Sequence, residues 1–551
     1  MTAFDLLLRG GVVVDGSNGP AYPADIAVSD GRVAVIGSIP ADVRAPVEID
    51  ARGRHVMPGF IDIHSHSDFV LADPAHGEVL RCFLEQGITT LVTGNCGFAP
   101  APCTPGHRTE MESYTAFLRS AGARAAWPTF GAYLDQLDSQ GVALNVVPLA
   151  AHGAMRIASM GFAGSAPDDD QLRQMVRAAD EAMDAGAFGI SAGLAYAPGM
   201  YASTAEVTAL AARAGRAGGL FTCHSRGLSE TLVDAVSEVV QITRDARVRG
   251  QFSHLCALGE GNWPKIGRAI DVLDTARRSG IDIATDCQAY IAGNTTLTAL
   301  FPPWSIEGGV DALVARLGSP AGRARIRAEI LHGAPTWPLV SGGWTDNMIA
   351  SLGWDGIWLL QVGASDYKRF EGGSLLAMAE DRGIDPFDAL CDLVEADRGE
   401  SMMLVVGSAG SLRNDAPLRE VLALPFTSLE TDAIVTGTGV RNRGALGAYP
   451  RMLGHFVRDE RLLPLEQAVH QMTGLAADRL GLADVGRIRA GAAADLVVVD
   501  MDSVADTSDY RNPETPPTGI QDVIVNGVPV VGSAATGTPY AGKVYRHTTR
   551  G

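Results

Sequence analysis

Eight short apolar segments alternate with amphipathic helical stretches along the middle of this 551-residue chain. A buried parallel strand is a short apolar run, whereas a covering helix repeats its apolar residues every three to four positions. This alternation is typical of a parallel α/β architecture. The predicted strands are Met57–His64, Thr89–Cys96, Leu144–His152, Phe188–Leu194, Leu220–His224, Gly250–His254, Asp282–Tyr290 and Phe426–Asp432.

The helical stretches between these strands favour a TIM-like (β/α)8 barrel. Four of them are well defined, at Asp168–Ala185, Thr204–Ala217, Ser229–Arg244 and Ile266–Arg278. Eight strand–helix units match the number that closes such a barrel. An open, doubly wound sheet remains as the alternative fold.

The two ends of the chain differ from the middle. Both hold short strand-like runs separated by turn residues, and neither has enough apolar surface to fold alone. We therefore expect one β-sandwich domain built from residues 1–55 and 485–551, beside a barrel formed by residues 56–484. A stretch near 300–345, rich in proline and tryptophan, breaks the alternation and predicts an inserted lid.

The formal net charge of -19 argues against nucleic acid and anionic membranes as partners, because both would repel the chain. No apolar run is long enough to span a bilayer, and the first residues do not resemble a signal peptide. The seven cysteines are dispersed, which predicts reduced thiols and a cytoplasmic location. We expect a small-molecule substrate, and the oligomeric state stays open.

Polar side chains of the kind that bind metals follow several of the predicted strands. In a barrel the carboxyl ends of the strands meet at one mouth, so these side chains would meet there. Imidazole and thiolate ligands suit zinc, which acidifies water and polarises a carbonyl, and a nearby carboxylate can carry the proton. The candidates are His64, His66, Cys96, His224, His254 and Asp432.

Each candidate also has a structural interpretation. A single histidine after a strand is commonly a structural or surface residue, Cys96 suits a small buried filler, and Asp432 suits a helix cap. The combination of a His-x-His pair with three further ligand-type residues at strand ends favours the metal site.

The motifs resemble those of the D-aminoacylase (N-acyl-D-amino-acid deacylase) branch of the amidohydrolase superfamily. The resemblance covers nearly the whole chain. It is carried by MPGFIDIHSHSD from Met57, TGNCGFAPAP from Thr93, GLFTCH from Gly219, FSHL from Phe252, GAYPRMLGH from Gly447 and GAAADLVVVD from Gly491.

This resemblance implies zinc as the metal and hydrolysis of an N-acyl-D-amino acid to a carboxylate and a D-amino acid. It implies that Cys96, His224 and His254 hold one zinc tightly. His64 and His66 would form a second, weaker site that Cys96 bridges.

Two placements compete for the family's catalytic aspartate. If the last strand is Ala433–Thr436, Thr438 occupies the position, which would suggest an inactive hydrolase. If the strand is Phe426–Glu430, directly after Pro425, Asp432 occupies it. The second placement needs no gap after the preceding helix, so we assign Asp432 as the catalytic acid–base.

The predicted substrate pocket departs from the family. The lysine that often follows the sixth-strand histidine is replaced by Cys256, and the usual Gln-Tyr-Pro-Tyr reads Cys287-Gln-Ala-Tyr290. Tyr196, Arg226 and Tyr290 stand at family-like positions, and Arg443, from the loop Arg441-Asn-Arg443-Gly, completes the expected substrate-binding set. The altered carboxylate site keeps other functions open, namely hydrolysis of a different amide, lactam or ester, or a metal-dependent lyase reaction. A non-catalytic binding protein is the hypothesis from another class.

Overall fold

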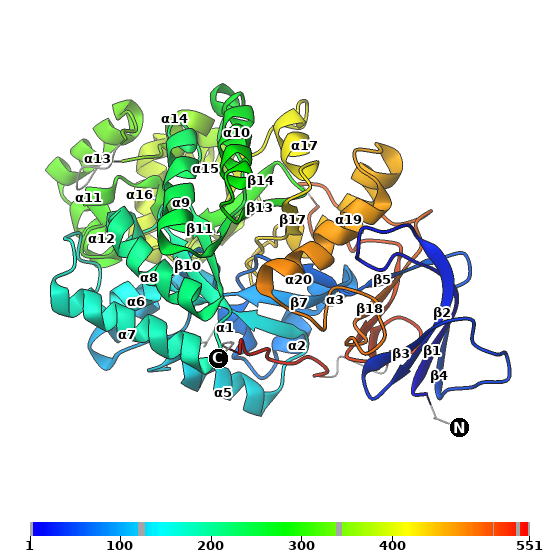
Figure 1. Ribbon diagram of the computed structural model, residues 1–551. Helices are drawn as coiled ribbons and strands as arrows, with labels where there is room; N and C mark the ends of the chain where they lie inside the picture. Colours follow the sequence, from blue (N-terminus) through cyan, green and yellow to red (C-terminus); the bar gives the residue numbers. More distant parts are fainter. Residues whose placement is uncertain (1–3, 120–126, 338–343, 511, 536–539, 549–551) are drawn as a thin grey trace.

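A closed ring of parallel strands forms the centre of the molecule. The computed structural model describes residues 4–119, 127–337, 344–510, 512–535 and 540–548, and helices surround the ring (Figure 1). Its strands pair in the orders β6-β7-β8 and β9-β10-β11-β12-β13-β17, with β8 continuing into β9. They are β6 (Phe60–Asp62), β7 (Ile88–Thr93), β8 (Asn145–Pro148), β9 (Ala150–Ala151), β10 (Gly189–Gly193), β11 (Leu220–His224), β12 (Arg249–Phe252), β13 (Ile283–Gln288) and β17 (Thr427–Glu430).

The ring closes between its first and last strands. Ser65 and Ala433 form a parallel bridge, and the N–H of Asp432 donates to the carbonyl of His64 at 2.9 Å. The TIM-like barrel predicted from the sequence is therefore confirmed, and the open sheet is excluded. Some boundaries differ: Met57 and Pro58 belong to β5 (His55–Pro58) of a separate sheet, and His152 begins a helix instead of ending a strand.

The helices predicted from periodicity cover the outside of the barrel. Asp168 caps α7 by accepting from the Gln171 N–H at 2.8 Å, while the Gln171 side chain accepts from the Asp168 N–H at 2.9 Å. The helix expected from Ser229 begins at Leu232 instead, because the Ser229 hydroxyl bonds Glu230 at 2.5 Å and Asp346 rather than capping. The covering helices include α5 (Phe130–Gln140), α6 (His152–Met160), α7 (Asp169–Ala185), α8 (Thr204–Ala217), α9 (Leu232–Ala246), α10 (Lys265–Arg278), α19 (Leu465–Met472) and α20 (Gly474–Leu480).

The insertion between β13 and β17 is longer than the stretch near 300–345 that the sequence predicted. It opens at β14 (Ala292–Thr296) and returns at β16 (Met402–Val406), which pairs antiparallel with both β14 and β15 (Ile357–Gln361). Helices and strands of the insertion continue past residue 345, so the predicted stretch covers only part of it. Residues 338–343 lie outside the described part. Its helices are α11 (Pro303–Ile306), α12 (Val310–Leu317), α13 (Pro320–His332), α14 (Met348–Leu352), α15 (Leu375–Arg382) and α16 (Pro386–Asp397).

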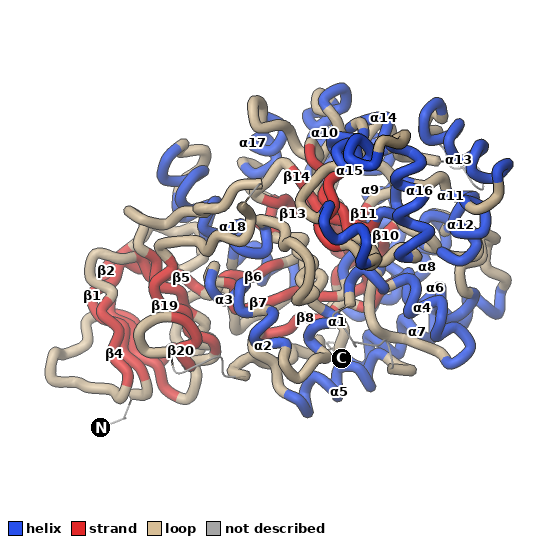
Figure 2. The backbone as a smooth tube through the Cα atoms, turned by 180° about the vertical axis from the view of Figure 1, so that it is seen from behind, coloured by secondary structure: helices blue, strands red, loops and turns tan. Residues whose placement is uncertain are grey.

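Strands from both chain ends share one sheet beside the barrel, seen at the left of Figure 2. Its order is β20-β19-β18-β5-β1-β2-β3, with β4 on β1. Apolar side chains from both ends, such as Leu6 and Leu496, pack in one core. The exact domain boundaries stay a prediction. The strands are β1 (Leu6–Val13), β2 (Tyr22–Ser29), β3 (Arg32–Gly37), β4 (Val47–Asp50), β18 (Leu496–Val499), β19 (Ile520–Val525) and β20 (Val528–Val531).

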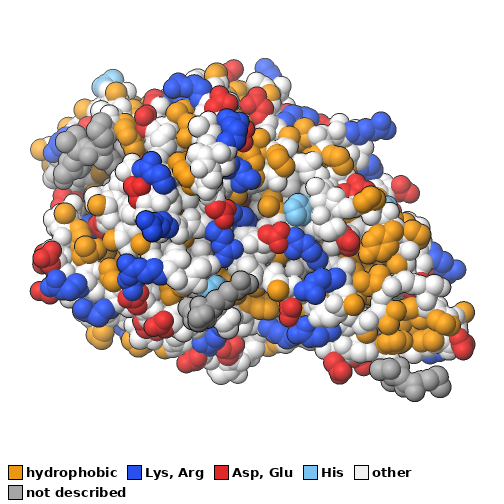
Figure 3. Space-filling view, in the orientation of Figure 1, with side chains coloured by type: hydrophobic (Ala, Val, Ile, Leu, Met, Phe, Trp, Pro, Cys, Tyr) orange, Lys and Arg blue, Asp and Glu red, His pale blue; other side chains and the backbone are white. Residues whose placement is uncertain are grey.

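The C-terminal segment returns from this sheet to the barrel. The N–H of Val146 in β8 donates to the Lys543 carbonyl at 2.8 Å, and the Tyr545 N–H donates to the Val146 carbonyl at 2.8 Å. On the face shown in Figure 3, acidic and basic side chains are mixed over the barrel helices. Within the described ranges, no helix has the length and apolar character needed to cross a membrane.

Candidate metal centre and active site

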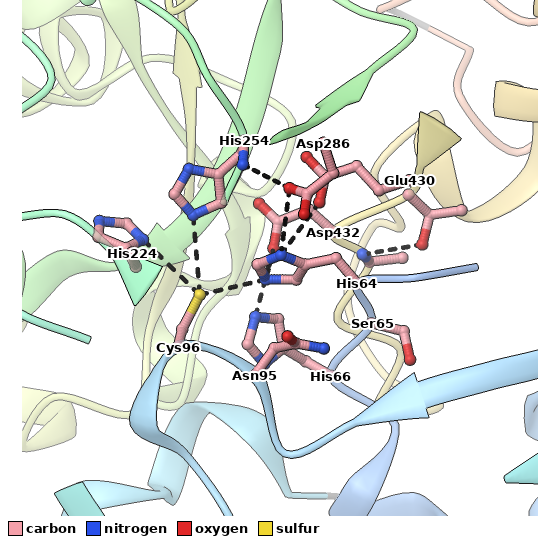
Figure 4. Close-up of polar contacts among 12 residues, drawn as sticks. His64, Ser65, His66, Asn95, Cys96, His224, His254, Asp286, Glu430 and Asp432 are labelled. Atoms are coloured by element: carbon pink, nitrogen blue, oxygen red, sulfur yellow. Dashed lines mark hydrogen bonds and ion pairs between the residues drawn. The ribbon is translucent and has the colours of Figure 1, made fainter. Parts of the chain in front are cut away.

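The five side chains predicted as metal ligands converge at the carboxyl ends of the barrel strands. All five are buried. Figure 4 shows the Cys96 sulfur facing ring nitrogens of His64, His224 and His254, with His66 beside them. The set is His64, His66, Cys96, His224 and His254.

Cys96, His224 and His254 form one triangle of donor atoms. The Cys96 sulfur lies 3.7 Å from His224 Nδ1 and 3.7 Å from His254 Nε2. Tetrahedral zinc, at about 2.3 Å from sulfur and about 2.0–2.1 Å from nitrogen, would place such atoms about 3.5–3.6 Å apart. The donor set and its spacing therefore fit a zinc ion with one position left for another ligand.

A second group of donors shares Cys96 with the first. His64 Nε2 lies 3.1 Å from the Cys96 sulfur. Asp432 Oδ1 lies 3.4 Å from His64 Nε2 and 3.3 Å from His66 Nε2. Cys96 thus stands between two candidate metal positions.

An unusual turn presents the Cys96 sulfur. Gly94 has φ +81°, and a Cβ there would lie 1.9 Å from the Leu149 carbonyl oxygen, so only glycine fits. Cys96 itself has φ 51°, and His254 and Asp432 also have positive φ, at 38° and 46°. Side-chain-bearing residues in this region are strained, and such strain gathers at functional sites.

Two buried carboxyl groups, those of Glu430 and Asp286, contact the His64 ring and the His254 backbone. Glu430 Oε2 lies 3.1 Å from His64 Nδ1, which leaves Nε2 facing Cys96. Asp286 accepts from the backbone N–H of His254 at 2.5 Å and from the Gln251 side chain at 2.9 Å, and its Oδ1 lies 3.6 Å from His64 Nδ1. A carboxylate beside the second ring nitrogen, as at His64, fixes the orientation of a metal-binding imidazole. The sequence analysis missed both residues, although an acidic residue inside a buried strand was a visible signal.

A bound cation would stabilise the ionised forms of the buried acidic groups in this centre. Burial raises the pKa of the Cys96 thiol well above its usual range, and the carboxylates of Asp432 and Glu430 raise it further. Burial likewise raises the pKa of Glu430, with Asp286 adding to the effect. A bound metal ion is the ordinary means of holding a buried cysteine as thiolate.

Asp432 lies at the metal centre, whereas Thr438 does not. Burial alone would raise the pKa of Asp432, but its contacts with His66, His64 and His254 lower it below the usual range. Gln288 Nε2 donates to Asp432 Oδ2 at 2.9 Å. Thr438 is exposed and contacts Thr436. The geometry therefore favours the strand placement that ends before Asp432.

A pocket opens beside the metal centre and encloses about 580 Å³ of empty space, including solvent at its mouth. Three of the predicted substrate-binding residues, Tyr196, Cys256 and Tyr290, line it. The Tyr196 hydroxyl lies 3.3 Å from His224 Nδ1. Gln288, Asn294 and Thr295 also line the pocket and were missed by the sequence analysis.

The two predicted substrate-binding arginines do not line this pocket. Arg226 pairs with Glu238 at 2.9 Å and donates to the carbonyls of Met200 and Ala202, so it joins the loop after β11 to its surroundings. Arg443 pairs with Asp506 at 2.6 Å. Carboxylates of the chain itself pair with both guanidinium groups, and direct substrate contact by either arginine stays a prediction.

Comparisons with known proteins agree with this architecture. The chain is 31% identical over 545 residues to a D-aminoacylase of Alcaligenes xylosoxydans xylosoxydans, covering 99% of this chain and 98% of the relative. It is 32% identical over 543 residues to an N-acyl-D-aspartate deacylase of the same organism, covering 98% and 94%.

The crystal structure of an N-acyl-D-glutamate deacylase from Bordetella bronchiseptica, complexed with zinc and a phosphonate inhibitor, superposes with a TM-score of 0.81 at 28% identity, covering 99% of this chain and 100% of that one. A D-aminoacylase structure described as having a binuclear metal center reaches 0.79 at 28% identity, covering 98% and 100%. The Amidohydrolase family model matches residues 47–249 and 378–531. This chain therefore belongs to the amidohydrolase family.

Proposed function

We propose that this protein hydrolyses a linear amide bond at a zinc centre held by Cys96, His224 and His254. The observation that carries the proposal is the triangle of one thiol and two imidazoles, buried at the inner end of a pocket beside Asp432. Zinc bound there would acidify water and polarise the amide carbonyl. We further propose that His64, His66 and Cys96 hold a second, weaker metal.

Asp432 is the group of this chain that moves the proton. Its Oδ1 faces His64 and His66, and its carboxylate lines the pocket. A carboxylate with a lowered pKa is ready to accept a proton from water, and it can then deliver that proton to the leaving amine nitrogen. Tyr196, whose hydroxyl lies near His224, is available to donate a hydrogen bond to the acyl oxygen.

The relatives' names supply the first substrates to test, namely N-acyl-D-amino acids. Hydrolysis of such an amide needs only the metal centre, Asp432 and room for the acyl group. We also propose that the enzyme works in the cytoplasm, since its seven cysteines are unpaired.

The test combines metal content with turnover. The purified protein is assayed for zinc by elemental analysis, and release of free amine is followed on paired D and L N-acyl compounds with several acyl groups. We expect about one zinc per chain, activity that chelators abolish and zinc restores, and preference for D substrates. A zinc-loaded protein that cleaves no amide would refute the proposal.

A further inference from the structure

We infer that the amine half of the substrate is uncharged and apolar, and carries no free carboxylate. This inference rests on the proposed amide hydrolysis and concerns only which amide the pocket accepts. Its basis is the wall of the pocket beside the metal centre. Six apolar side chains line this wall: Leu228, Leu255, Leu258, Met348, Val405 and Ala409.

The pocket offers no side-chain cation to a carboxylate. Among the described residues that line it, none is lysine or arginine, and the one carboxylate is that of Asp432. Cys256, two residues after His254, presents a thiol at the wall. Burying a carboxylate without a partner is costly, and a second carboxylate nearby adds repulsion.

The two guanidinium groups that lie against Tyr290 bond to other parts of the chain. Arg443 donates to Asp506 at 2.6 Å and to the Ser508 carbonyl at 2.7 Å. Arg451 donates to the Ala289 carbonyl at 2.9 Å. Both guanidinium carbons lie against the ring of Tyr290, at 4.8 and 5.4 Å from its centroid.

Asp506 accepts hydrogen bonds from Tyr290 and Arg443, two donors that could otherwise bind a substrate carboxylate. The Tyr290 hydroxyl donates to Asp506 Oδ2 at 2.7 Å, to the same oxygen that accepts from Arg443. The Asp506 side chain is only 2% exposed. An internal carboxylate therefore neutralises Arg443 and occupies the Tyr290 hydroxyl, and the apolar part of the wall favours an apolar group.

The test compares substrates that share an acyl group and differ only at the carboxyl position. N-acyl-D-leucine, N-acyl-D-leucinamide and the N-acyl derivative of 3-methylbutylamine are assayed with acetyl, hexanoyl and benzoyl groups on the zinc-loaded enzyme. We expect kcat/KM for the two neutral compounds to exceed that of the acid by about tenfold or more, the scale of one charged hydrogen bond. Equal or faster cleavage of the acid would overturn the inference and leave amide hydrolysis standing. Failure on every compound would instead reject amide hydrolysis itself.

Two variants test the proposed cause. Cys256→Lys adds a cation to the wall, and Asp506→Asn releases Arg443 and the Tyr290 hydroxyl from a carboxylate. Each should raise the acid-to-amide ratio of kcat/KM by about tenfold. Cys256→Met is the matched control, because it adds length without charge, and its ratio should stay at the wild-type value. An unchanged acid-to-amide ratio in both Cys256→Lys and Asp506→Asn would overturn the inference. If Asp506→Asn does not fold, the comparison of Cys256→Lys with Cys256→Met decides it.

Discussion

The side-chain amide of Gln288 holds the carboxylate of Asp432, with Nε2 donating to Oδ2 at 2.9 Å. This bond leaves Asp432 Oδ1 facing His64 and His66. The Asn294 side chain donates to the Asp432 carbonyl at 3.0 Å and so supports the strained backbone of the same residue. The insertion and the strand before it therefore fix the position of the carboxylate that we propose as the proton carrier.

Gln288 is expected to be a positioning residue. Replacing it in Gln288→Leu should lower kcat by about 10–100-fold with a smaller change in KM, because Asp432 loses its orienting donor. Gln288→Glu places a second carboxyl beside Asp432, so the acidic limb of the pH–rate profile should move to higher pH. Both are measured by steady-state kinetics across pH. A profile unchanged in both variants would mean that Gln288 does not act through Asp432.

Asp432→Asn should abolish the proton transfer and lower kcat by about 10²–10⁴. The protein should stay folded and retain zinc in the Cys96, His224 and His254 triangle. Kinetics, elemental analysis and thermal unfolding are measured on the same preparation. Thr438→Val is the control and should behave as wild type, since Thr438 is exposed. Near-wild-type turnover in Asp432→Asn would falsify the assignment.

Cys96→Ala should remove most of the bound zinc, because Cys96 supplies the one thiol donor in both candidate ligand groups. Activity should fall with zinc content, as measured by elemental analysis after equilibration against a chelator buffer. Cys223→Ala is the matched control: Cys223 is buried in the neighbouring strand β11 and belongs to neither ligand group. Full occupancy in Cys96→Ala would show that the metal binds elsewhere.

Asp495 joins the terminal sheet to the barrel and should contribute to stability. It accepts from the Asn145 side chain at 2.8 Å and from the Asn526 N–H at 2.7 Å. Asp495→Ala leaves both donors buried without this partner, so the free energy of unfolding should fall by about 2–4 kcal/mol. The measurement is denaturant unfolding, with the exposed Asp502→Ala as a control of little effect.

The contribution of Asp495 should depend on pH. Burial raises its pKa to about 6, above the ordinary value of about 3.9 in an unfolded chain. The folded state therefore binds the proton more tightly, and the stability that this group adds is greatest below about pH 4 and is lost as pH rises through about 6. The stability difference between wild type and Asp495→Ala should shrink over this interval. A difference that grows with pH would contradict the raised pKa.

Local patterns in the sequence were enough to predict the barrel and to single out its candidate metal ligands. The strand Leu220–His224 and the helix Thr204–Ala217 appear with the predicted bounds, because each carries its own periodicity and terminal signals. The ligands could be placed together before any coordinates, since the carboxyl ends of parallel barrel strands meet at one mouth. Asp432 was harder, because two short strands were compatible with the same stretch of sequence.

Only the tertiary structure decided which side chains surround the candidate metal ligands. The sequence offered Tyr290 and Arg443 as candidates for binding a substrate carboxylate. In the structure, both donate hydrogen bonds to Asp506 from the C-terminal part of the chain. Glu430 and Asp286 likewise reach His64 only because the barrel closes. Periodicity reports which face of an element is buried, but it carries no information on which distant side chain will lie against that face. The candidate ligand set could therefore be predicted from local sequence, whereas the charge around the pocket depends on contacts between residues far apart along the chain.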